Sequence, residues 1–235
     1  MEALVVTPVK DSPETTRRTI EAISVADGNF EYVVFNDFSS KETRDFLENN
    51  QELFRFRLIN LEDYIDTPSP NYKTVLEMSQ EMALKNSVPL ILIESDVIIK
   101  KNTITELLRL YSELPNPGSI GAVTVDQEGN HNFPYSYVRK DNASWQKTKR
   151  SLSFCCTLIS PAFLGSCNFK ELSGKKDWYD IHISRQSLHA GFYNYLVKEL
   201  SVLHLPHSSR PWKQLKYTHP IRYYFYKLTR RRDRI

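Results

Sequence analysis

The stretch Pro89-Leu90-Ile91-Leu92-Ile93-Glu94-Ser95-Asp96 joins an uninterrupted apolar run to two carboxylates. Such a run is typical of a central strand that is buried on both faces of a parallel sheet. Two acids separated by one residue at the end of such a strand can hold a divalent cation against a diphosphate, although they could instead cap the next turn. Because polar side chains beside a buried strand are costly unless they are used, the stretch indicates an α/β fold with a site at the strand end.

Segments with strand and helix patterns alternate on both sides of this run. Apolar runs predict strands at residues 3–7, 32–35, 56–60, 89–93, 120–125, 153–160 and 195–205. Amphipathic stretches predict helices at residues 13–23, 40–50, 70–83, 103–114, 180–190 and 221–228. This alternation implies right-handed βαβ units around a mainly parallel sheet. A chain of 235 residues suits one domain, which we place at residues 1–207, followed by a helical tail at 208–235.

Serine residues mark three of the predicted helix starts. Ser12 and Ser69 each precede a proline, which is the order of an N-cap residue and the first helical residue. Ser39 and Glu42 have the spacing of a capping box, in which each side chain accepts a hydrogen bond from the backbone of the other. We therefore expect Ser12, Ser39 and Ser69 to cap the helices that follow them.

Charge is divided unevenly along the chain. Residues 208–235 carry nine Lys and Arg against one acid, a net +8, which leaves −5 for residues 1–207 of the overall +3. An acidic main body argues against a protein that binds nucleic acid over its surface. The basic tail suggests a partner of its own, such as anionic lipid.

Cysteine content and hydropathy indicate the cellular compartment in which the protein works. The three cysteines, two of which are adjacent, fit neither a disulfide framework nor a cysteine-based zinc site. No uncharged apolar run reaches the roughly 18 residues of a membrane span, and the first residues lack the basic region of a signal peptide. We therefore expect a protein of the reducing cytoplasm.

Polar residues follow three of the predicted strands. Ligands of open α/β sheets bind at the carboxyl ends of the strands, which directs attention to Thr7-Pro8-Val9, Asn36-Asp37 and Glu94-Ser95-Asp96. An aspartate after the second strand can accept hydrogen bonds from a base or a ribose. Asn36-Asp37 also fits ordinary turn chemistry, which Asn and Asp supply routinely.

The second half of the chain contains further candidates for chemistry. Asp180 stands at a predicted helix start, where it could cap the helix or act as a general base, and Asp177 is an alternative base. His204 and His207 end the last apolar run and could bind a metal or a phosphate, although a strand histidine is often structural. The polar segment 126–150 is expected to be a long loop with a functional role.

The order of these motifs resembles that of the family 2 glycosyltransferases of the GT-A fold. That family has a Thr-Pro turn after the first strand, Asp-Asp-Gly-Ser after the second and Asp-x-Asp after the fourth. Later come a Glu-Asp-x-Asp-Leu helix start, an Ala-Gly-aromatic helix end and often a histidine. The matching segments, within residues 3–207, are Thr7-Pro8-Val9-Lys10, Asn36-Asp37-Phe38-Ser39, Glu94-Ser95-Asp96, Tyr179-Asp180-Ile181-His182-Ile183, Ala190-Gly191-Phe192 and His204.

The resemblance implies a single GT-A, Rossmann-like α/β domain with a mixed, mainly parallel central sheet. Residues 1–125 would bind a nucleotide-diphospho-sugar donor, and residues 126–207 would bind the acceptor and carry the catalytic residue, Asp180. Asp96 and His204 would hold Mn²⁺ or Mg²⁺. The residues implied in nucleotide-sugar binding are Thr7, Pro8, Val9, Asp37, Lys73, Glu94, Ser95 and Asp96.

Departures from the family pattern narrow the implied activity. Phe38 stands in the place of the glycine, Glu94 in the place of the first acid of Asp-x-Asp, and Tyr179 in the place of the acid before Asp180. No Gln-x-x-Arg-Trp motif follows Asp180, which argues against a processive synthase. The expected function is therefore inverting transfer of a single sugar to a saccharide or lipid-linked saccharide, as in the assembly of bacterial cell-surface polysaccharide or lipopolysaccharide.

Two other functions and two uses of the tail stay open. A sugar nucleotidyltransferase would need a glycine-rich basic loop after the first strand, and Pro8-Val9-Lys10-Asp11-Ser12-Pro13 lacks the glycines. A non-catalytic binding module would show no metal-dependent nucleotide binding. The tail could lie on the inner face of the membrane, as a basic and aromatic helix does. It could instead pack on the body through Ile221, Tyr224, Phe225 and Leu228.

Overall fold

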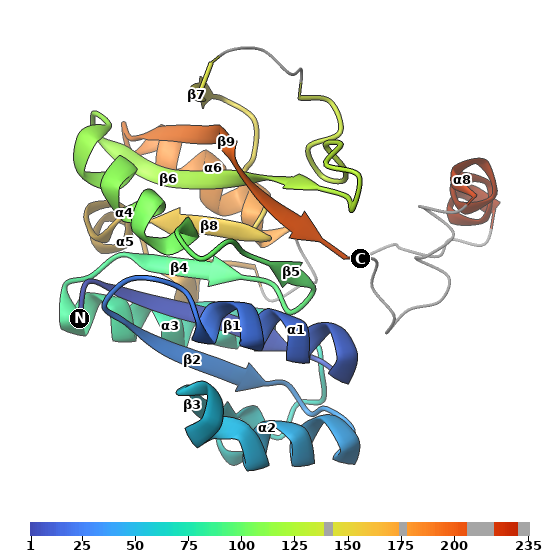
Figure 1. The fold of residues 1–235 in the computed structure, drawn as a ribbon. Helices are drawn as coiled ribbons and strands as arrows, with labels where there is room; N and C mark the ends of the chain where they lie inside the picture. Colours follow the sequence, from blue (N-terminus) through green and yellow to red (C-terminus); the bar gives the residue numbers. More distant parts are fainter. Residues whose placement is uncertain (139–142, 174–177, 206–218, 230–235) are drawn as a thin grey trace.

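The computed structural model describes residues 1–138, 143–173, 178–205 and 219–229, and it confirms a mixed α/β fold (Figure 1). Nine strands form one sheet within these residues. Their bounds are β1 (Ala3–Val9), β2 (Phe30–Asn36), β3 (Arg57–Asn60), β4 (Leu90–Ile93), β5 (Val97–Ile98), β6 (Pro117–Val125), β7 (Trp145–Thr148), β8 (Cys156–Ile159) and β9 (Tyr193–His204).

The sheet is mainly parallel, with three strands reversed. Its order is β3-β2-β1-β4-β8-β6-β9-β5, and β7 pairs with β9 beside this path. The strands β3, β2, β1 and β4 are mutually parallel, and so are β6 and β9. The strand β8 lies antiparallel between β4 and β6, while β5 and β7 run antiparallel to β9. The carboxyl ends of β1, β2, β4 and β9 therefore meet at one edge.

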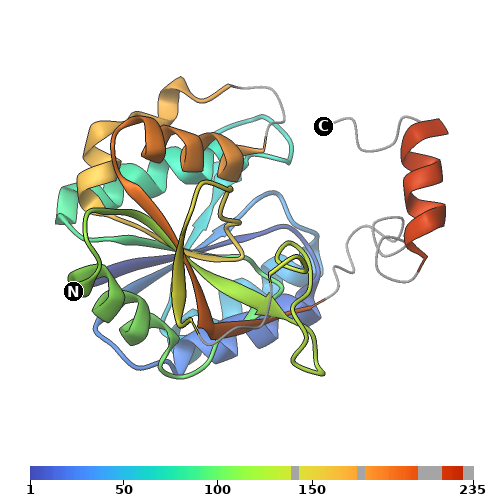
Figure 2. The ribbon, with the colours of Figure 1, turned by 90° about the horizontal axis from the view of Figure 1, so that it is seen from above.

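Helices cover both faces of this sheet, which Figure 2 shows fanning out through its twist. The helices α1 (Pro13–Ser24), α2 (Lys41–Phe54) and α4 (Thr103–Glu113) pack on one face. On the other lie α3 (Tyr72–Asn86), α5 (Pro161–Ser166), the short helix η2 (Phe169–Glu171) and α6 (Tyr179–His189). A further short helix, η1 (Leu61–Asp63), follows β3.

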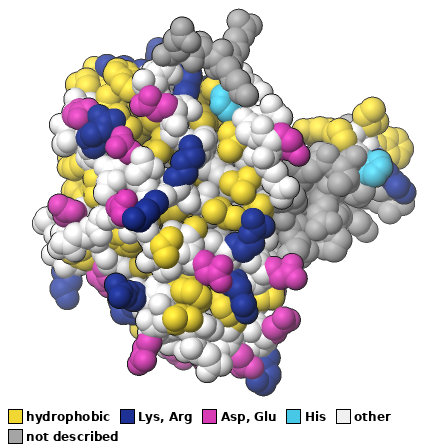
Figure 3. Space-filling model, viewed as in Figure 1, with side chains coloured by type: hydrophobic (Ala, Val, Ile, Leu, Met, Phe, Trp, Pro, Cys, Tyr) yellow, Lys and Arg dark blue, Asp and Glu magenta, His cyan; other side chains and the backbone are white. Residues whose placement is uncertain are grey.

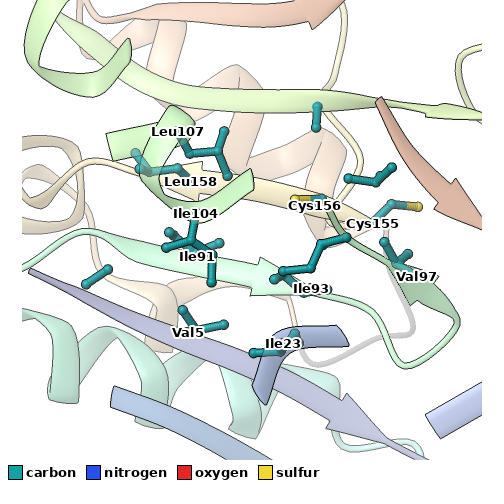
Figure 4. Close-up of a cluster of buried hydrophobic side chains, with 14 of the residues drawn as sticks. Val5, Ile23, Ile91, Ile93, Val97, Ile104, Leu107, Cys155, Cys156 and Leu158 are labelled. Atoms are coloured by element: carbon teal, nitrogen blue, oxygen red, sulfur yellow. The ribbon is translucent and has the colours of Figure 1, made fainter. Parts of the chain in front are cut away.

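Residue alternation along the central strands supplies a core to each face. Val5 and Ile91 belong to the cluster on the α1 side, whereas Leu4 and Leu92 belong to the cluster on the α3 side. Figure 4 shows Ile23 of α1 and Ile104 of α4 near Val5 and Ile91. The strand β4 is buried at all four of its residues, so the apolar run at 89–93 correctly indicated a strand covered on both faces.

Of the three predicted helix caps, one is confirmed and two are wrong. Ser12 is the N-cap residue of α1 and Pro13 its first residue, although the left-handed backbone of Ser12 (φ 58) leaves α1 without a side-chain capping hydrogen bond. The Ser39 hydroxyl instead accepts a hydrogen bond from the backbone of Asp11 at 3.0 Å, and Ser40 is the N-cap residue of α2. Ser69 donates to the Asp37 carboxylate at 2.8 Å, and Asn71 is the N-cap residue of α3. In these two cases a tertiary contact overrides the local preference.

The segment 126–150 and the tail also differ from expectation. The segment is not a plain loop, because it contains β7 and a bridge between Val125 and His131. The tail contains the helix α8 (Pro220–Thr229), whose Ile221 is 87% exposed, with Tyr224 and Phe225 also exposed. Packing on the body through those three side chains, one of the two uses left open for the tail, is therefore wrong, and the side chain of Leu228 lies outside the described part of the structure. Figure 3 shows apolar atoms gathered on the surface of α8. None of the described helices is long and apolar enough to span a bilayer.

We predict that Gly118→Ala destabilises the fold. A Cβ atom at this position in β6 would lie 2.0 Å from Ser187 Oγ and 2.7 Å from Phe192 Cβ, so α6 would have to move. Overpacking of this kind costs about 1–3 kcal/mol, which urea unfolding would measure. Gly165→Ala in α5 is the matched control, because its Cβ would meet only Leu84 Cδ2 at 3.8 Å. Equal stability of Gly118→Ala and the native protein would contradict the packing argument.

Candidate functional site

The carboxyl edge of the sheet gathers acidic, imidazole and thiol groups from distant parts of the chain. Glu94 and Asp96 follow β4, His204 ends β9, and Cys155 directly precedes β8. The antiparallel direction of β8 explains the place of Cys155, because the start of a reversed strand lies beside the end of its neighbour. The register pairs Ile93 with Cys156, so Glu94 and Cys155 follow as the next opposed residues.

Asp96 is the most deeply buried acid of this group, with no exposed surface. Its Oδ2 lies 3.2 Å from Nε2 of His204, and its backbone carbonyl accepts a hydrogen bond from the N–H of Leu205 at 2.8 Å. The short strand β5 adds backbone pairing of Val97 with His204. Asp96 and His204, the two residues that the resemblance implies as metal ligands, are therefore adjacent in the structure.

His204 is oriented by a second hydrogen bond on the far side of its ring. Nδ1 lies 2.8 Å from the carbonyl oxygen of Phe133, and because a carbonyl only accepts, Nδ1 carries the proton. This leaves Nε2 facing Asp96. Burial lowers the pKa of His204, but the hydrogen bond to Asp96 and the charges of Asp96 and Glu94 outweigh it, so the pKa lies above the ordinary histidine value.

Cys155 and Glu94 complete the group. The thiol of Cys155 donates to Oε2 of Glu94 at 3.3 Å, and donor atoms of Glu94, Cys155 and His204 all lie within 4.8 Å of one another. Burial and the neighbouring charges of Glu94 and Asp96 raise the pKa of Cys155. Carboxylate, imidazole and sulfur are all ligands of divalent metals, so these residues fit a metal ion by their chemistry.

Asp180 lies in the first turn of α6. Its Oδ1 accepts a hydrogen bond from the backbone N–H of Ile181 at 2.9 Å, and burial raises the pKa of its carboxyl above the usual aspartate value. Tyr72, at the start of α3, is affected by acids from both parts of the chain. Burial first, and then the charges of Glu94 and Asp180, raise the pKa of its phenol. Asp177, the alternative base, lies outside the described residues.

The Tyr72 phenol is a functional candidate that the sequence did not reveal. Its hydroxyl is buried and has no hydrogen-bond partner among the described residues. Its ring lies 6.2 Å from that of Phe154 and 6.3 Å from that of Tyr179. In the sequence Tyr72 was one member of an apolar helical stripe, and no signal separated it from its core neighbours. The sequence also gave no reason to choose Cys155, since it is one of two adjacent cysteines.

Asp37 organises the loop before α3. Its carboxylate accepts hydrogen bonds at 2.8 Å from the Ser69 hydroxyl, the Asn71 backbone and the Asn71 side chain. Nearby, Asp11 joins the loops after β1 and β2, because its Oδ1 accepts from the backbone of Ser40 at 2.6 Å. The edge predicted to receive a nucleotide is thus built from three hydrogen-bonded loops.

The other predicted nucleotide-binding residues differ in their surroundings. Thr7 and Val9 are buried, and Thr7 Oγ1 accepts a hydrogen bond from Tyr32 at 3.1 Å. Pro8 is half-buried, and Ser95, between the two acids, is 7% exposed. Lys73 donates to the carbonyl of Lys170 at 3.0 Å and pairs with Glu77. The structure therefore directs the Lys73 ammonium toward η2 and its own helix. His207 lies outside the described residues.

Comparisons with known proteins agree with this architecture. Among solved structures, S. aureus TarS residues 1–349 in complex with UDP-GlcNAc has a TM-score of 0.64 at 14% identity, covering 89% of this chain and 60% of that one. The mannosyltransferase PcManGT from Pyrobaculum calidifontis, in complex with GDP-Man and Mn²⁺, has a TM-score of 0.65 at 11% identity, with coverages of 97% and 64%. GalNAc-T7 with UDP, GalNAc and Mn²⁺ has a TM-score of 0.66 at 13% identity, with coverages of 89% and 44%.

At these identities the likeness shows a shared GT-A fold, and the chain spans less than two thirds of each of these proteins. The comparison with curated protein sequences gave no match. The comparison with protein families gave one, because the model described as "Glycosyl transferase family 2" matches residues 4–167, which is more than half of the chain. That segment runs from β1 through Glu94, Asp96 and Cys155, and the chain belongs to glycosyl transferase family 2.

Proposed function

We propose that the protein transfers a single sugar from a nucleotide-diphospho-sugar to an acceptor hydroxyl, with inversion at the anomeric carbon. The observation that carries the proposal is a group of possible metal ligands at one sheet edge. Donor atoms of Glu94, Cys155 and His204 lie within 4.8 Å of one another, and Asp96 Oδ2 lies 3.2 Å from His204 Nε2. Asp180, whose pKa is raised by burial, is the candidate base, and its charge and that of Glu94 both act on the Tyr72 phenol. Support also comes from the similar folds that were solved with UDP-GlcNAc or GDP-Man.

Asp96 and His204 would hold the metal, with Glu94 beside them. The metal, Mn²⁺ or Mg²⁺, would neutralise charge on the departing nucleoside diphosphate. The chain's own contribution is to fix the ligands: Phe133 holds the His204 ring, and the backbone of Leu205 anchors Asp96. Mn²⁺ in two of the similar structures is consistent with this assignment.

Asp180 would act as the general base. As the acceptor oxygen bonds to the anomeric carbon, the bond from that carbon to the diphosphate oxygen breaks, and the acceptor proton passes to the Asp180 carboxylate. A carboxyl whose pKa is raised by burial holds a proton more readily than an exposed one, so burial suits this role. Attack from the face opposite the leaving group inverts the configuration.

The loops after β1 and β2 would bind the nucleotide. Thr7, Pro8 and Val9 would line the base pocket, while Asp37, Glu94 and Ser95 would lie along the ribose. Because Asp37 already holds Ser69 and Asn71, its contact with a ribose would be made from a fixed position. Lys73 would contact the diphosphate only after leaving its partners Lys170 and Glu77.

The acceptor would be a saccharide or a lipid-linked saccharide of bacterial cell-surface polysaccharide or lipopolysaccharide. The exposed apolar side chains of α8 support this class, because a basic helix with an exposed apolar face binds anionic membrane surfaces. The protein would then work in the cytoplasm, in peripheral contact with the inner face of the membrane through residues 208–235, without nucleic acid as a partner.

Calorimetry with UDP, GDP and dTDP, each with and without Mn²⁺, tests this function. We expect one of the three nucleotides to bind, and to bind at least tenfold more tightly with Mn²⁺, because the diphosphate and the buried acids share the ion. The preferred nucleotide would identify the base of the donor. Absence of metal-dependent binding for all three would favour a non-catalytic binding module instead.

Asp180→Asn should abolish turnover while donor binding stays within about twofold. Asparagine keeps the shape and the hydrogen bond to Ile181 but cannot take the acceptor proton, and loss of a general base lowers rates about 10²–10⁴-fold. Product formation and nucleotide calorimetry measure the two effects separately. Asp45→Asn, at an exposed ion pair on α2, is the matched control. Near-normal turnover of Asp180→Asn would show that another group is the base.

Replacing Ile221, Tyr224 and Phe225 together by serine should weaken binding to anionic vesicles at least tenfold. These side chains are exposed, so the change keeps the charge of the tail and removes only its apolar face. Flotation with vesicles of phosphatidylglycerol and phosphatidylcholine measures the effect, and pure phosphatidylcholine vesicles serve as the uncharged control. Unchanged flotation of the triple variant would show that the apolar face of α8 does not bind the membrane.

A further inference from the structure

Cys155 brings a sulfur atom into a site otherwise made of oxygen and nitrogen donors. The side chain is 1% exposed, and its Sγ lies 3.3 Å from Glu94 Oε2 and 3.2 Å from Ser153 Oγ. Cys155 belongs to none of the motifs on which the resemblance to the family rests. The thiol therefore needs an explanation of its own.

The neighbouring cysteine shows what a purely structural thiol looks like in this protein. Cys156 begins β8, is fully buried in the apolar cluster, and has a pKa raised to about 12 by burial alone. In Figure 4 the two sulfur atoms point away from each other, with that of Cys155 toward the side of β5. Cys155, unlike Cys156, lies among charged groups, since both Glu94 and Asp96 act on it.

The donor atoms around Cys155 are close enough for one ion to bind them. Ligand distances of about 2.0–2.3 Å around zinc place tetrahedral ligand atoms roughly 3.5 Å apart. The donor atoms of Glu94, Cys155 and His204 lie within 4.8 Å of one another. Rotation of the half-buried Glu94 side chain can close the remaining gap, because its carboxylate is carried on flexible torsions.

His204 already has the orientation of a metal ligand. Its Nδ1 donates to the Phe133 carbonyl, which leaves Nε2 directed at the cluster, and Asp96 Oδ2 lies 3.2 Å from Nε2. Metal-binding histidines commonly donate their other ring N–H to a carbonyl or a carboxylate in this way. Asp96 is therefore a fourth possible donor beside Glu94, Cys155 and His204.

We propose that Cys155 is a direct ligand in this site and that the site selects a divalent cation with affinity for sulfur, of the Zn²⁺ and Co²⁺ class, over Mg²⁺. Thiolate favours such ions, whereas Mg²⁺ takes oxygen ligands almost alone. When the sulfur binds the ion, the thiol proton leaves to solvent and the hydrogen bond to Glu94 is replaced by the shared metal. The inference rests on the proposed function and changes one part of it, because it replaces Mg²⁺ in the same site by a cation with affinity for sulfur.

Absorption spectroscopy of the full chain with Co²⁺, in the absence of nucleotide, tests the proposal. A Co²⁺ ion bound by thiolate absorbs in the near ultraviolet through sulfur-to-metal charge transfer, which oxygen and nitrogen ligands do not produce. We expect this band in the native protein and in Cys156→Ala, and its loss in Cys155→Ser. Calorimetry should show Zn²⁺ affinity at least tenfold lower in Cys155→Ser, with Mg²⁺ affinity unchanged.

Absence of the band from the native protein would overturn the proposal, and that result does not depend on whether any variant folds. A band that persists in Cys155→Ser would also overturn it, because the sulfur would then come from elsewhere. The readouts need neither donor nor acceptor. A protein that binds Co²⁺ through Cys155 but fails to bind nucleotide would refute the proposed function and leave this inference standing.

Discussion

Burial of the Asp96 carboxylate is the constraint on which the site and the end of the sheet depend. A carboxylate without exposed surface loses its hydration, and only a close partner of opposite charge or a strong donor can compensate for that loss. His204 provides the partner from the other end of the domain, at the last residue of β9. The residue after Asp96, Val97, pairs with His204 where β5 lies against β9. The site and the pairing of these two strands therefore depend on the same residues.

The fold was largely predictable because its signals are local. The apolar runs at 89–93 and 120–125 are strands, and Asp96 and His204 meet because strand ends meet at one edge. What failed were features decided by tertiary contacts. Ser69 bonds to Asp37 instead of capping a helix, and α8 exposes three residues of the stripe that could have packed on the body. The neighbours of Cys155 and Tyr72 come from distant parts of the chain. No local sequence pattern therefore predicts the surroundings of these two residues.

The departure of Phe38 from the family's glycine has a structural consequence. Phe38 adopts the left-handed backbone (φ 54) that glycine accepts without cost and that a side chain accepts at about 1–2 kcal/mol. The turn is kept by its neighbours: the Lys10 ammonium donates to the Phe38 carbonyl, and Asp11 holds Ser40. The turn therefore keeps the geometry that glycine would supply, and Phe38 adds apolar contact with the core on the α3 side.

Negative charge dominates this edge of the sheet, and the titrating groups there respond to it. Burial raises the pKa of Cys155 and Tyr72, and the charges of Glu94 and its acidic neighbours raise it further. For His204 burial lowers the pKa, but the hydrogen bond and charge of Asp96 and the charge of Glu94 outweigh it. Each shift favours the form with one more proton. A divalent cation among these ligands would act in the opposite sense on Cys155 and His204, since it favours thiolate and neutral imidazole. The carboxylates of the site account for part of the acidic balance of residues 1–207, whereas α8, the described helix of the tail, lies apart from the sheet (Figure 1).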